Sequence, residues 1–233
     1  MFTIRISQLN IGIDNKYEYL PDMCRDYITE EKAEYIISAT DEEIKKETNI
    51  DNTDLGYGEF LAIYRKIAQL IISENGFLMH GVACDVKGEG VAFLAPSGVG
   101  KSTHASLWKD FLGDDFVYVN GDKPLVRIID NIVYAYGTPW AGKENLQSNI
   151  KTPLKKLCFI KRSDENRCVK LKKEDILEPL MKQIYIPENS KDFIMILDLL
   201  DKFIKNIEFY RIECNISKDA AKTSYEVIFS EGN

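Results

Sequence analysis

The sequence predicts an α/β protein with a core of mixed β-sheet flanked by helices and a small N-terminal α+β extension. Segments of strand period and of helical period alternate along the chain without a regular βαβ repeat. The apolar strand "VAFLA" (91–95) leads directly into a glycine-containing loop and a predicted helix. The first forty residues, in contrast, contain only short strand patterns separated by polar turns.

The predicted extension covers residues 1–55, and the predicted main domain covers residues 56–233. In the extension, strands are expected at "FTIRI", "IGI" and "AEYIIS", followed by a charged linker, "TDEEIKKETNIDNTD" (40–54). From Gly58 to Glu74 the apolar residues fall on one helical face, and Asn75-Gly76 is a good C-terminal cap. The main domain therefore opens with a helix.

The main domain continues with a β-hairpin, "FLMHGVACDV" (77–86) with "VAFLA", and a helix that begins at Lys101 or Ser102 and ends before Gly113. Further strands are expected at 116–120, 125–130 and 132–136, together with a pair formed by 154–162 and 168–173. The chain is then expected to form helices at 174–184 and 191–206, a strand at 207–214 and a helix from Lys218.

The composition excludes several classes of protein. The chain has 233 residues, 45% of them hydrophobic and 29% charged, with a net charge of −7, whereas a nucleic-acid binder needs a clustered basic face. No apolar run approaches the roughly 20 residues of a membrane span, and "MFTIRISQLN" is typical of a strand and not of a signal peptide. We expect a cytoplasmic protein with no nucleic-acid or membrane partner.

The cysteines and histidines do not predict a metal centre. Five cysteines are widely spaced without a C-x-x-C pair, and the chain has only two histidines. Cys84 and Cys158 lie in apolar strand patterns, where a reduced cysteine acts as a small hydrophobe. Zinc is therefore not expected.

The stretch "LAPSGVGKSTHASLW" (94–108) has the spacing of a phosphate-binding loop. Two glycines let the backbone approach an anion, and the following helix directs its free N–H groups and positive dipole end at the same point. Ala95 replaces the first glycine of the usual pattern, at its least demanding position. We expect Lys101 to contact the β- and γ-phosphates of ATP and the Ser102 hydroxyl to hold Mg²⁺. The residues expected to bind ATP are Ser97, Gly98, Val99, Gly100, Lys101, Ser102 and Thr103.

Asp122 is the only acid at the end of the next predicted strand, in "VNGDKP". A carboxylate in that position could face the γ-phosphate and accept the proton of an acceptor hydroxyl. The alternative is a simple turn, because "NGDKP" is rich in turn-forming residues. The two interpretations are compatible.

Three stretches together resemble the HPr kinase/phosphorylase superfamily, and most closely its stand-alone relatives and the tailoring kinases of peptide biosynthesis: "MHGVACDVKGEGVAFLAPSGVGKSTHASLW", "VNGDKPLVRI" and "YGTPWAGKENL". The resemblance covers residues 77–162 and implies the P-loop core shared by the HPr kinase C-terminal domain and phosphoenolpyruvate carboxykinase. It implies that His80 borders the active site and orients the catalytic acid, and it is compatible with a homo-oligomer. Without the resemblance, a lone histidine on an apolar strand is more often a core residue.

The sequence departs from the superfamily at one position. HPr kinases have two adjacent acids after this strand, and here Gly121 replaces the first. Asp122 then takes both roles, as base and as metal ligand beside Ser102, which leaves the reversibility of the reaction open. His104, one turn into the predicted helix, could touch the site or pack beneath it.

The loop "GTPWAGKEN" (137–145) is the last candidate region, because substrate contacts concentrate in loops at strand ends. Lys143 is a candidate second cation for the transferred phosphoryl group, and Arg162 is a weaker one. Trp140 is interpreted either as an exposed substrate contact or as an aromatic that caps the core.

The sequence therefore predicts an ATP- and Mg²⁺-dependent kinase that phosphorylates a hydroxyl, with Ser or Thr of a protein or peptide favoured over a small-molecule acceptor. The predicted catalytic residues are Asp122, His80, Lys101 and Lys143. The alternative is an ATP-binding regulatory or interaction module with little or no transfer, which Gly121 favours and Asp122 opposes. A carboxykinase is disfavoured by length, because those chains are far longer and carry a second substrate-binding lobe.

Overall fold

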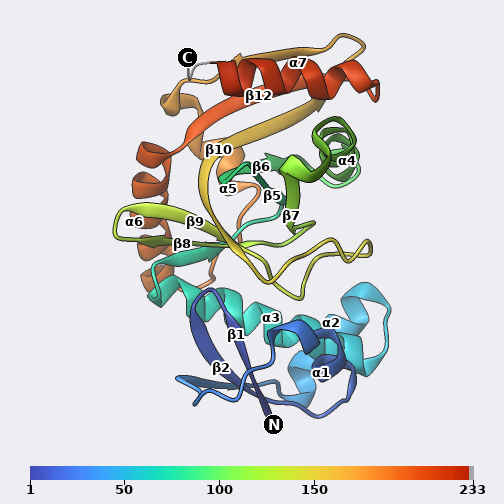
Figure 1. Cartoon of the computed structure of the whole chain (residues 1–233). Helices are drawn as coiled ribbons and strands as arrows, with labels where there is room; N and C mark the ends of the chain where they lie inside the picture. Colours follow the sequence, from blue (N-terminus) through green and yellow to red (C-terminus); the bar gives the residue numbers. More distant parts are fainter. Residues whose placement is uncertain (231–233) are drawn as a thin grey trace.

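The computed structural model describes residues 1–230 and has the predicted α/β class (Figure 1). A mixed, curled nine-stranded sheet is flanked by helices, and a separate three-stranded sheet lies at the N-terminal end. This architecture is compatible with a nucleotide-binding fold.

The strands are β1 (Phe2–Ile6), β2 (Leu9–Asp14), β3 (Tyr35–Ser38), β4 (Gly76–Leu78), β5 (Val82–Val86), β6 (Glu89–Leu94), β7 (Phe116–Asn120), β8 (Leu125–Ile129), β9 (Ile132–Tyr136), β10 (Lys151–Arg162), β11 (Arg167–Lys170) and β12 (Glu208–Cys214). The α-helices are α1 (Tyr19–Met23), α2 (Asp41–Asp51), α3 (Leu55–Ser73), α4 (Lys101–Leu112), α5 (Leu177–Met181), α6 (Ser190–Asn206) and α7 (Lys218–Phe229). Short 3-10 turns occur at Arg25–Tyr27, Gly113–Asp115 and Lys173–Asp175. Within residues 1–230, none of the helices combines the length and the apolar character that crossing a bilayer requires.

The N-terminal part of the chain packs on α3. Strands β1 and β2 form an antiparallel pair, and β3 lies parallel to β2. Their buried side chains share one hydrophobic cluster with residues of α3 and with Leu125, Tyr136 and Trp140 of the main domain. Because α3 contributes to this cluster and also contacts β4 and α6, it connects the two parts of the fold. The division at residue 55 stays a prediction.

The segment predicted as a linker forms helix α2, so that interpretation is wrong. Thr40 and Glu43 form a capping box, in which each side chain binds the backbone N–H of the other residue. Ile44 is buried against the core, and Glu47 pairs with Arg65 of α3 at 2.7 Å. The charged composition concealed a capped helix that is held by tertiary contacts.

The strand order of the main sheet is β4-β8-β9-β10-β6-β5-β7. Strand β10 pairs with β9 through its first residues and with β6 farther along, so the sheet curls around it. The predicted pairing of 154–162 with 168–173 is wrong, because β12 lies between them, parallel to β10 and antiparallel to β11. The predicted strand 77–86 is interrupted at Met79–Gly81, where the chain passes from β4, beside β8, to β5, beside β6 and β7.

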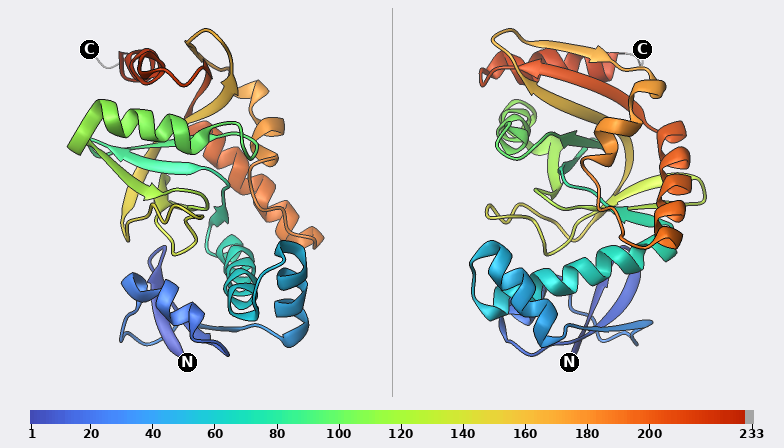
Figure 2. Two further views of the ribbon diagram at one scale, coloured as in Figure 1. Left: turned by 90° about the vertical axis from the view of Figure 1, so that its right-hand side faces the viewer. Right: turned by 180° about the vertical axis from the view of Figure 1, so that it is seen from behind.

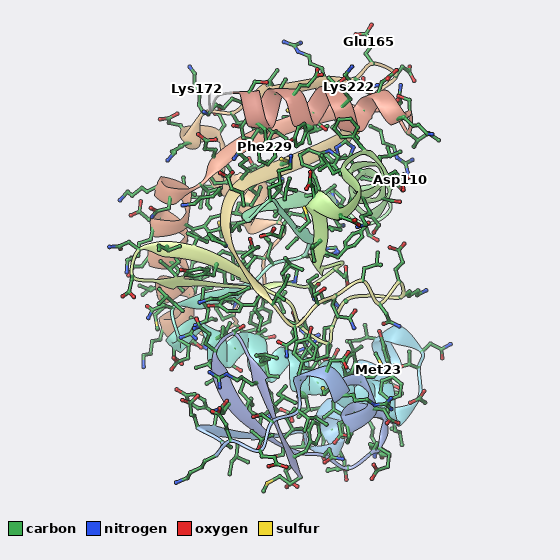
Figure 3. The ribbon with its side chains drawn as sticks, in the orientation of Figure 1. Met23, Asp110, Glu165, Lys172, Lys222 and Phe229 are labelled. Carbon is green, nitrogen blue, oxygen red and sulfur yellow. The ribbon has the colours of Figure 1, made fainter. Side chains whose placement is uncertain are left out.

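Helices cover both faces of this sheet, with α4 and α6 on opposite sides (Figure 2). In strand β6, successive side chains point to opposite faces of the sheet and pack against different helices. Phe93 packs with residues of α4 and α7, whereas Ala92 and Leu94 pack with residues of α5 and α6. Phe229 of α7 lies between that helix and β10 (Figure 3). The loop that follows β6 therefore emerges from a strand that is buried on both faces.

Candidate active site

The loop between β6 and α4 has the backbone geometry that the glycine spacing predicts. Gly98 and Gly100 have φ angles of 76° and 121°, in a region that residues with a Cβ rarely adopt. A Cβ at either position would meet no atom within 4 Å, so the space beside both glycines is open. Helix α4 begins at Lys101 with no side-chain cap, which leaves the N–H groups of its first turn available to an anion.

Lys101 lies at the start of α4, with only 8% of its surface exposed. Its Nζ donates a hydrogen bond to the carbonyl of Ala95 at 2.8 Å and lies 3.4 Å from Nε2 of His80. Burial lowers the pKa of Lys101, and the negative charge of Asp122 partly opposes this shift. The Lys101 ammonium is thus held by the Ala95 carbonyl and the His80 imidazole, two contacts that a bound anion could replace.

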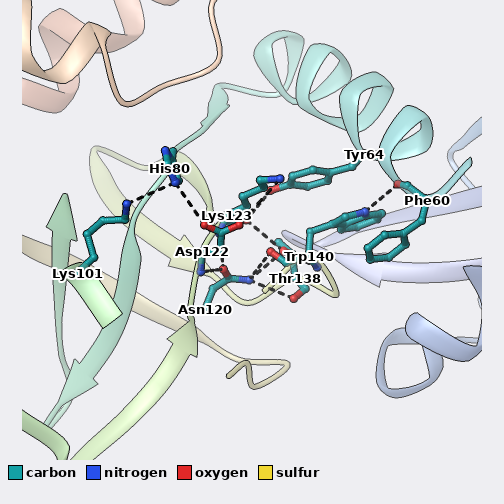
Figure 4. Close-up of polar contacts among 9 residues, drawn as sticks. All are labelled: Phe60, Tyr64, His80, Lys101, Asn120, Asp122, Lys123, Thr138 and Trp140. Carbon is teal, nitrogen blue, oxygen red and sulfur yellow. Dashed lines mark hydrogen bonds and ion pairs between the residues drawn. The ribbon is translucent and has the colours of Figure 1, made fainter. Parts of the chain in front are cut away.

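His80 connects Lys101 to Asp122. It lies between β4 and β5, where its backbone N–H donates to the carbonyl of Gln183 at 2.7 Å. Its Nε2 is 3.3 Å from Oδ1 of Asp122, and the neighbouring Gly81 N–H donates to the Asp122 carbonyl at 2.8 Å. The three side chains form a continuous row, although 21 positions separate His80 from Lys101 (Figure 4).

One nitrogen of His80 faces both neighbours. Nε2 can accept a hydrogen bond from Lys101 when it carries no proton, or donate one to Asp122 when it does, but not both at once. Any ligand that draws Lys101 away therefore favours the His80–Asp122 hydrogen bond. The row can respond to an anion at the loop.

The carboxyl group of Asp122 is held in its ionised form. Burial raises its pKa, but the hydrogen bond with His80 and the electrostatic interactions with Lys123, His80 and Lys101 outweigh this effect, so the pKa lies below the usual value. Oδ2 of Asp122 is 3.9 Å from Nζ of Lys123. Asp122 is consequently a carboxylate at neutral pH and can accept a hydrogen bond.

Asn120 is the positioning residue that the sequence analysis missed. Its side chain is fully buried, and its Oδ1 accepts hydrogen bonds from the N–H groups of Asp122 and Lys123 at 2.9 and 2.6 Å. Its Nδ2 donates to the carbonyl and hydroxyl oxygens of Thr138 at 3.1 and 3.0 Å (Figure 4). The segment is therefore a turn, as the alternative interpretation expected, and this turn presents the acid. The signal was an Asn before Gly-Asp at a strand end, which is typical of such side-chain turns.

Gly121 packs closely against the loop that follows β9. A Cβ at Gly121 would lie 3.1 Å from Cβ of Leu146 and 3.2 Å from the carbonyl of Ala141. These contacts are tighter than ordinary van der Waals distances, so the loop would have to shift by a few tenths of an ångström to admit a side chain at position 121. Glycine at this position therefore lets the loop pack closely against the turn that carries Asp122.

Trp140 is not exposed, so the interpretation as a core aromatic is correct. Only 2% of its surface is accessible, and its ring stacks on Tyr64 and Phe60 with centroid distances of 4.3 and 4.9 Å. Its Nε1 donates to the carbonyl of Phe60 at 2.8 Å. Lys143, three residues later, is exposed and forms no ion pair within residues 1–230.

His104 lies on the buried face of α4 and is not part of the row formed by Lys101, His80 and Asp122. Only 2% of it is exposed; its Nε2 lies 3.1 Å from Oγ of Ser224, and its Nδ1 lies 3.6 Å from Sγ of Cys214. Burial lowers the pKa of His104 to about 4. The imidazole is therefore neutral at pH 7 and links α4 to α7.

We predict that His104 makes the protein less stable in mild acid. The unfolded chain binds a proton at His104 near pH 6.5, and the folded chain binds it only near pH 4. The stability that neutral His104 contributes to the folded protein is therefore fully present above pH 6.5 and is lost as the pH falls toward 4. Between pH 7 and pH 5, this site alone should lower the free energy of unfolding by roughly 2 kcal/mol. Urea unfolding of the native protein and of His104→Gln at both pH values measures the difference, and an equal pH dependence in the two proteins would contradict the prediction.

Two cavities flank the row. One, of about 600 Å³, lies beside the loop and α4 and is lined by Val99, Gly100, Thr103, His104, Leu107 and by residues of 160–164 and 214–216. The other, of about 700 Å³, is lined by Asp122, Lys123, residues of 139–145 and residues of the N-terminal part and α3. Within residues 1–230, no group of three or more His, Cys, Asp or Glu side chains is arranged to hold a metal.

Fold and site together define an α/β protein that gathers a lysine, a histidine and an aspartate at the start of a helix. No protein-family model matches the chain, and no curated protein matches it in sequence. Among solved structures it is similar to the HPr(Ser) kinase/phosphatase from Coxiella burnetii, with a TM-score of 0.31, 11% identity, and coverage of 54% of this chain and 89% of that chain. A similarity this weak does not assign the chain to a family.

Proposed function

We propose that the protein is an ATP- and Mg²⁺-dependent kinase that transfers the γ-phosphate to the hydroxyl of a Ser or Thr residue. The observation that carries this proposal is the row formed by Lys101, His80 and Asp122. It joins a cation at a glycine-containing loop to an ionised carboxylate through one imidazole nitrogen. A cation for the phosphates and a base for the hydroxyl are the two groups that phosphoryl transfer needs most from a protein.

ATP is the phosphate donor in this proposal. Its phosphates would lie against the N–H groups of the loop and the first turn of α4, where Gly98 and Gly100 leave open space. The cavity of about 600 Å³ beside Val99 and Thr103 has the size of a small-molecule site and suits the nucleoside. Leu107, Ile160 and Ile216 provide its apolar surface.

The donor set suits Mg²⁺ bound together with a nucleotide. Mg²⁺ is commonly held by one or two protein oxygen atoms, with substrate phosphates and water completing the octahedron. The Ser102 hydroxyl, on the first turn of α4, and the Asp122 carboxylate are the protein oxygens we propose for it. When bound, the ion neutralises charge on the phosphates.

The proposed reaction follows from the row. The acceptor hydroxyl donates a hydrogen bond to Asp122, its oxygen forms a bond to the γ-phosphorus, and its proton passes to the carboxylate. The bond from the γ-phosphorus to the bridging oxygen breaks, and ADP leaves. Lys101, drawn to the phosphates, releases Nε2 of His80; in the tautomer that carries its proton on Nε2, His80 then donates a hydrogen bond to Asp122 and fixes its orientation.

The test is incubation of the purified protein with γ-labelled ATP, Mg²⁺ and a cell lysate, followed by identification of the labelled product. We expect label on a Ser or Thr hydroxyl. Tight ATP binding with no transfer would support the alternative, a regulatory ATP-binding module, which Gly121 favours. Absence of ATP binding would contradict both.

Arg162 supplies a prediction about the loop itself. Its guanidinium donates to the carbonyl of Val99 at 3.0 Å and to that of Gly98, so it supports the loop and is not directed at an anion. Arg162→Ala should weaken ATP binding by about tenfold. Each hydrogen bond from a charged donor contributes about 1.5 kcal/mol or more, but the exposure of this side chain to solvent reduces the combined effect of the two bonds. Calorimetric titration measures the change, with Arg167→Ala on β11 as the control. Equal affinities in the native protein and Arg162→Ala would remove this role.

A further inference from the structure

The cavity of about 700 Å³ lies where the N-terminal part of the chain meets the main domain. Asp122 and Lys123 line it from the turn after β7, and residues 139–145 line it from the loop after β9. Tyr19, Met23 and residues 53–61 line it from the N-terminal part and α3. The cavity therefore connects Asp122, the candidate base, with the N-terminal part of the chain, which contains none of the motifs of the sequence analysis.

Aromatic contacts fix the wall that the N-terminal part contributes. The rings of Tyr19 and Tyr57 meet edge to face at 5.9 Å, and Tyr19 meets Phe60 at 5.7 Å. Phe60 in turn stacks on the buried Trp140, which closes the cluster from the other side. Met23, on the N-terminal part in Figure 3, is half-buried, as are Tyr19 and Tyr57, so the wall offers apolar surface that is already ordered.

Asp122 lies recessed on the side of the cavity opposite the aromatic wall. The side chain of Asp122 is only 27% exposed, so a hydroxyl must enter the cavity to reach it. Gly142, with a φ angle of 76°, lies directly over the acid, and a Cβ there would be 3.1 Å from Cβ of Asp122. Two lysines, Lys123 and Lys143, and two acids, Asp122 and Asp54, line the cavity, so their formal charges balance and its apolar wall is the feature that can select a substrate.

The cavity is open to solvent and larger than one hydroxyl residue needs. Exposed residues from both parts of the chain, Asp54 and Lys143, line it, so a bound segment can continue beyond it. A flexible peptide can insert a Ser or Thr to the recessed acid, whereas a hydroxyl on a flat folded surface cannot.

We propose that this cavity binds a flexible peptide segment and recognises a large apolar side chain close to the phosphorylated Ser or Thr. The apolar side chain packs on Tyr19, Met23 and Tyr57 while the hydroxyl reaches Asp122. The inference rests on the proposed kinase function. It assigns the choice of substrate to the N-terminal part of the chain, which carries none of the phosphate-binding residues.

The test uses heptapeptides with a central Ser in an Ala/Glu background, in which one flanking position at a time carries Phe. Transfer from γ-labelled ATP is measured for each peptide, and ATP hydrolysis is measured without peptide. One or two Phe positions should raise kcat/KM by about tenfold, mainly through KM, since an apolar side chain in a matching pocket contributes 1–3 kcal/mol. A flat response to Phe, or labelling confined to small-molecule hydroxyls, would overturn the inference.

Variants of Met23 locate the effect. Met23→Ala should remove most of the preference for Phe, so that kcat/KM for the best Phe peptide falls toward the value for the peptide without Phe. Met23→Trp, which narrows the cavity at this wall, should raise KM for the peptides that carry Phe. Ile194→Ala, an exposed apolar residue of α6, is the matched control, and the melting temperature of each variant is measured to verify folding. A preference for Phe that survives in Met23→Ala would also overturn the inference, whereas loss of all ATP turnover in the native protein would contradict the kinase proposal itself.

Discussion

Asp122→Asn is expected to lower phosphate transfer by about a thousandfold, while ATP binding measured without Mg²⁺ changes little. The amide retains the size of the carboxyl group and can still accept a hydrogen bond from His80, but it cannot take the proton of the acceptor hydroxyl. General base catalysis typically contributes a factor of about 10² to 10⁴, and loss of the negative charge also weakens the proposed metal site. Single-turnover transfer from γ-labelled ATP, together with calorimetric titration of ATP, separates the two effects.

The matched control is Asp110→Asn, an exposed acid on the outer side of α4 (Figure 3). Asp110 is absent from the hydrogen bonds and ion pairs of the Lys101–His80–Asp122 row, so its transfer rate should stay within about twofold of the native rate. Retention of more than about a tenth of the native rate by Asp122→Asn would exclude Asp122 as the base.

Lys101→Ala is expected to abolish measurable ATP binding at millimolar nucleotide, and with it all turnover. Its ammonium is the only cation within hydrogen-bonding distance of His80 in the described part of the chain. Burial lowers the pKa of Lys101, so the folded protein carries a partly desolvated charge at this position. Removing that charge should leave the melting temperature unchanged or higher, which distinguishes loss of binding from loss of folding.

Lys155→Ala is the control for this prediction, since Lys155 is an exposed lysine on β10. It should bind ATP as the native protein does. If Lys101→Ala bound ATP with native affinity, the loop would not be a nucleotide site, and the kinase proposal would fall with it.

Most elements of the fold could be predicted from local patterns. The alternation in "FTIRI" predicts β1 with its observed bounds, and the glycine spacing predicts a helix that begins at Lys101. The failures were of another kind. Helix α2 was missed because its stability comes from a capping box and from contacts with α3, and β12 was not expected between β10 and β11 because strand order is a long-range property.

The candidate site was predicted unequally. Lys101 and Asp122 were chosen for their residue types and motif positions and His80 through the family resemblance, and the structure brings the three together in one row. Asn120 was missed because its role depends on Thr138, which lies 18 positions away. Lys143 was predicted as a second catalytic cation, and in the structure it lines the cavity beside Asp122.

By itself, the sequence determined the chemistry that is local to one stretch of chain: a loop with two glycines, a lysine at the start of a helix and an acid in a turn. These depend on backbone freedom, helix starts and turn propensities, which act over a few residues. Only the tertiary structure decided that the loop after β9 packs closely against Gly121, that Trp140 belongs to the core, and that Tyr19 and Met23 line the cavity beside Asp122. Those facts depend on packing between segments far apart in the chain, and no local pattern records that packing.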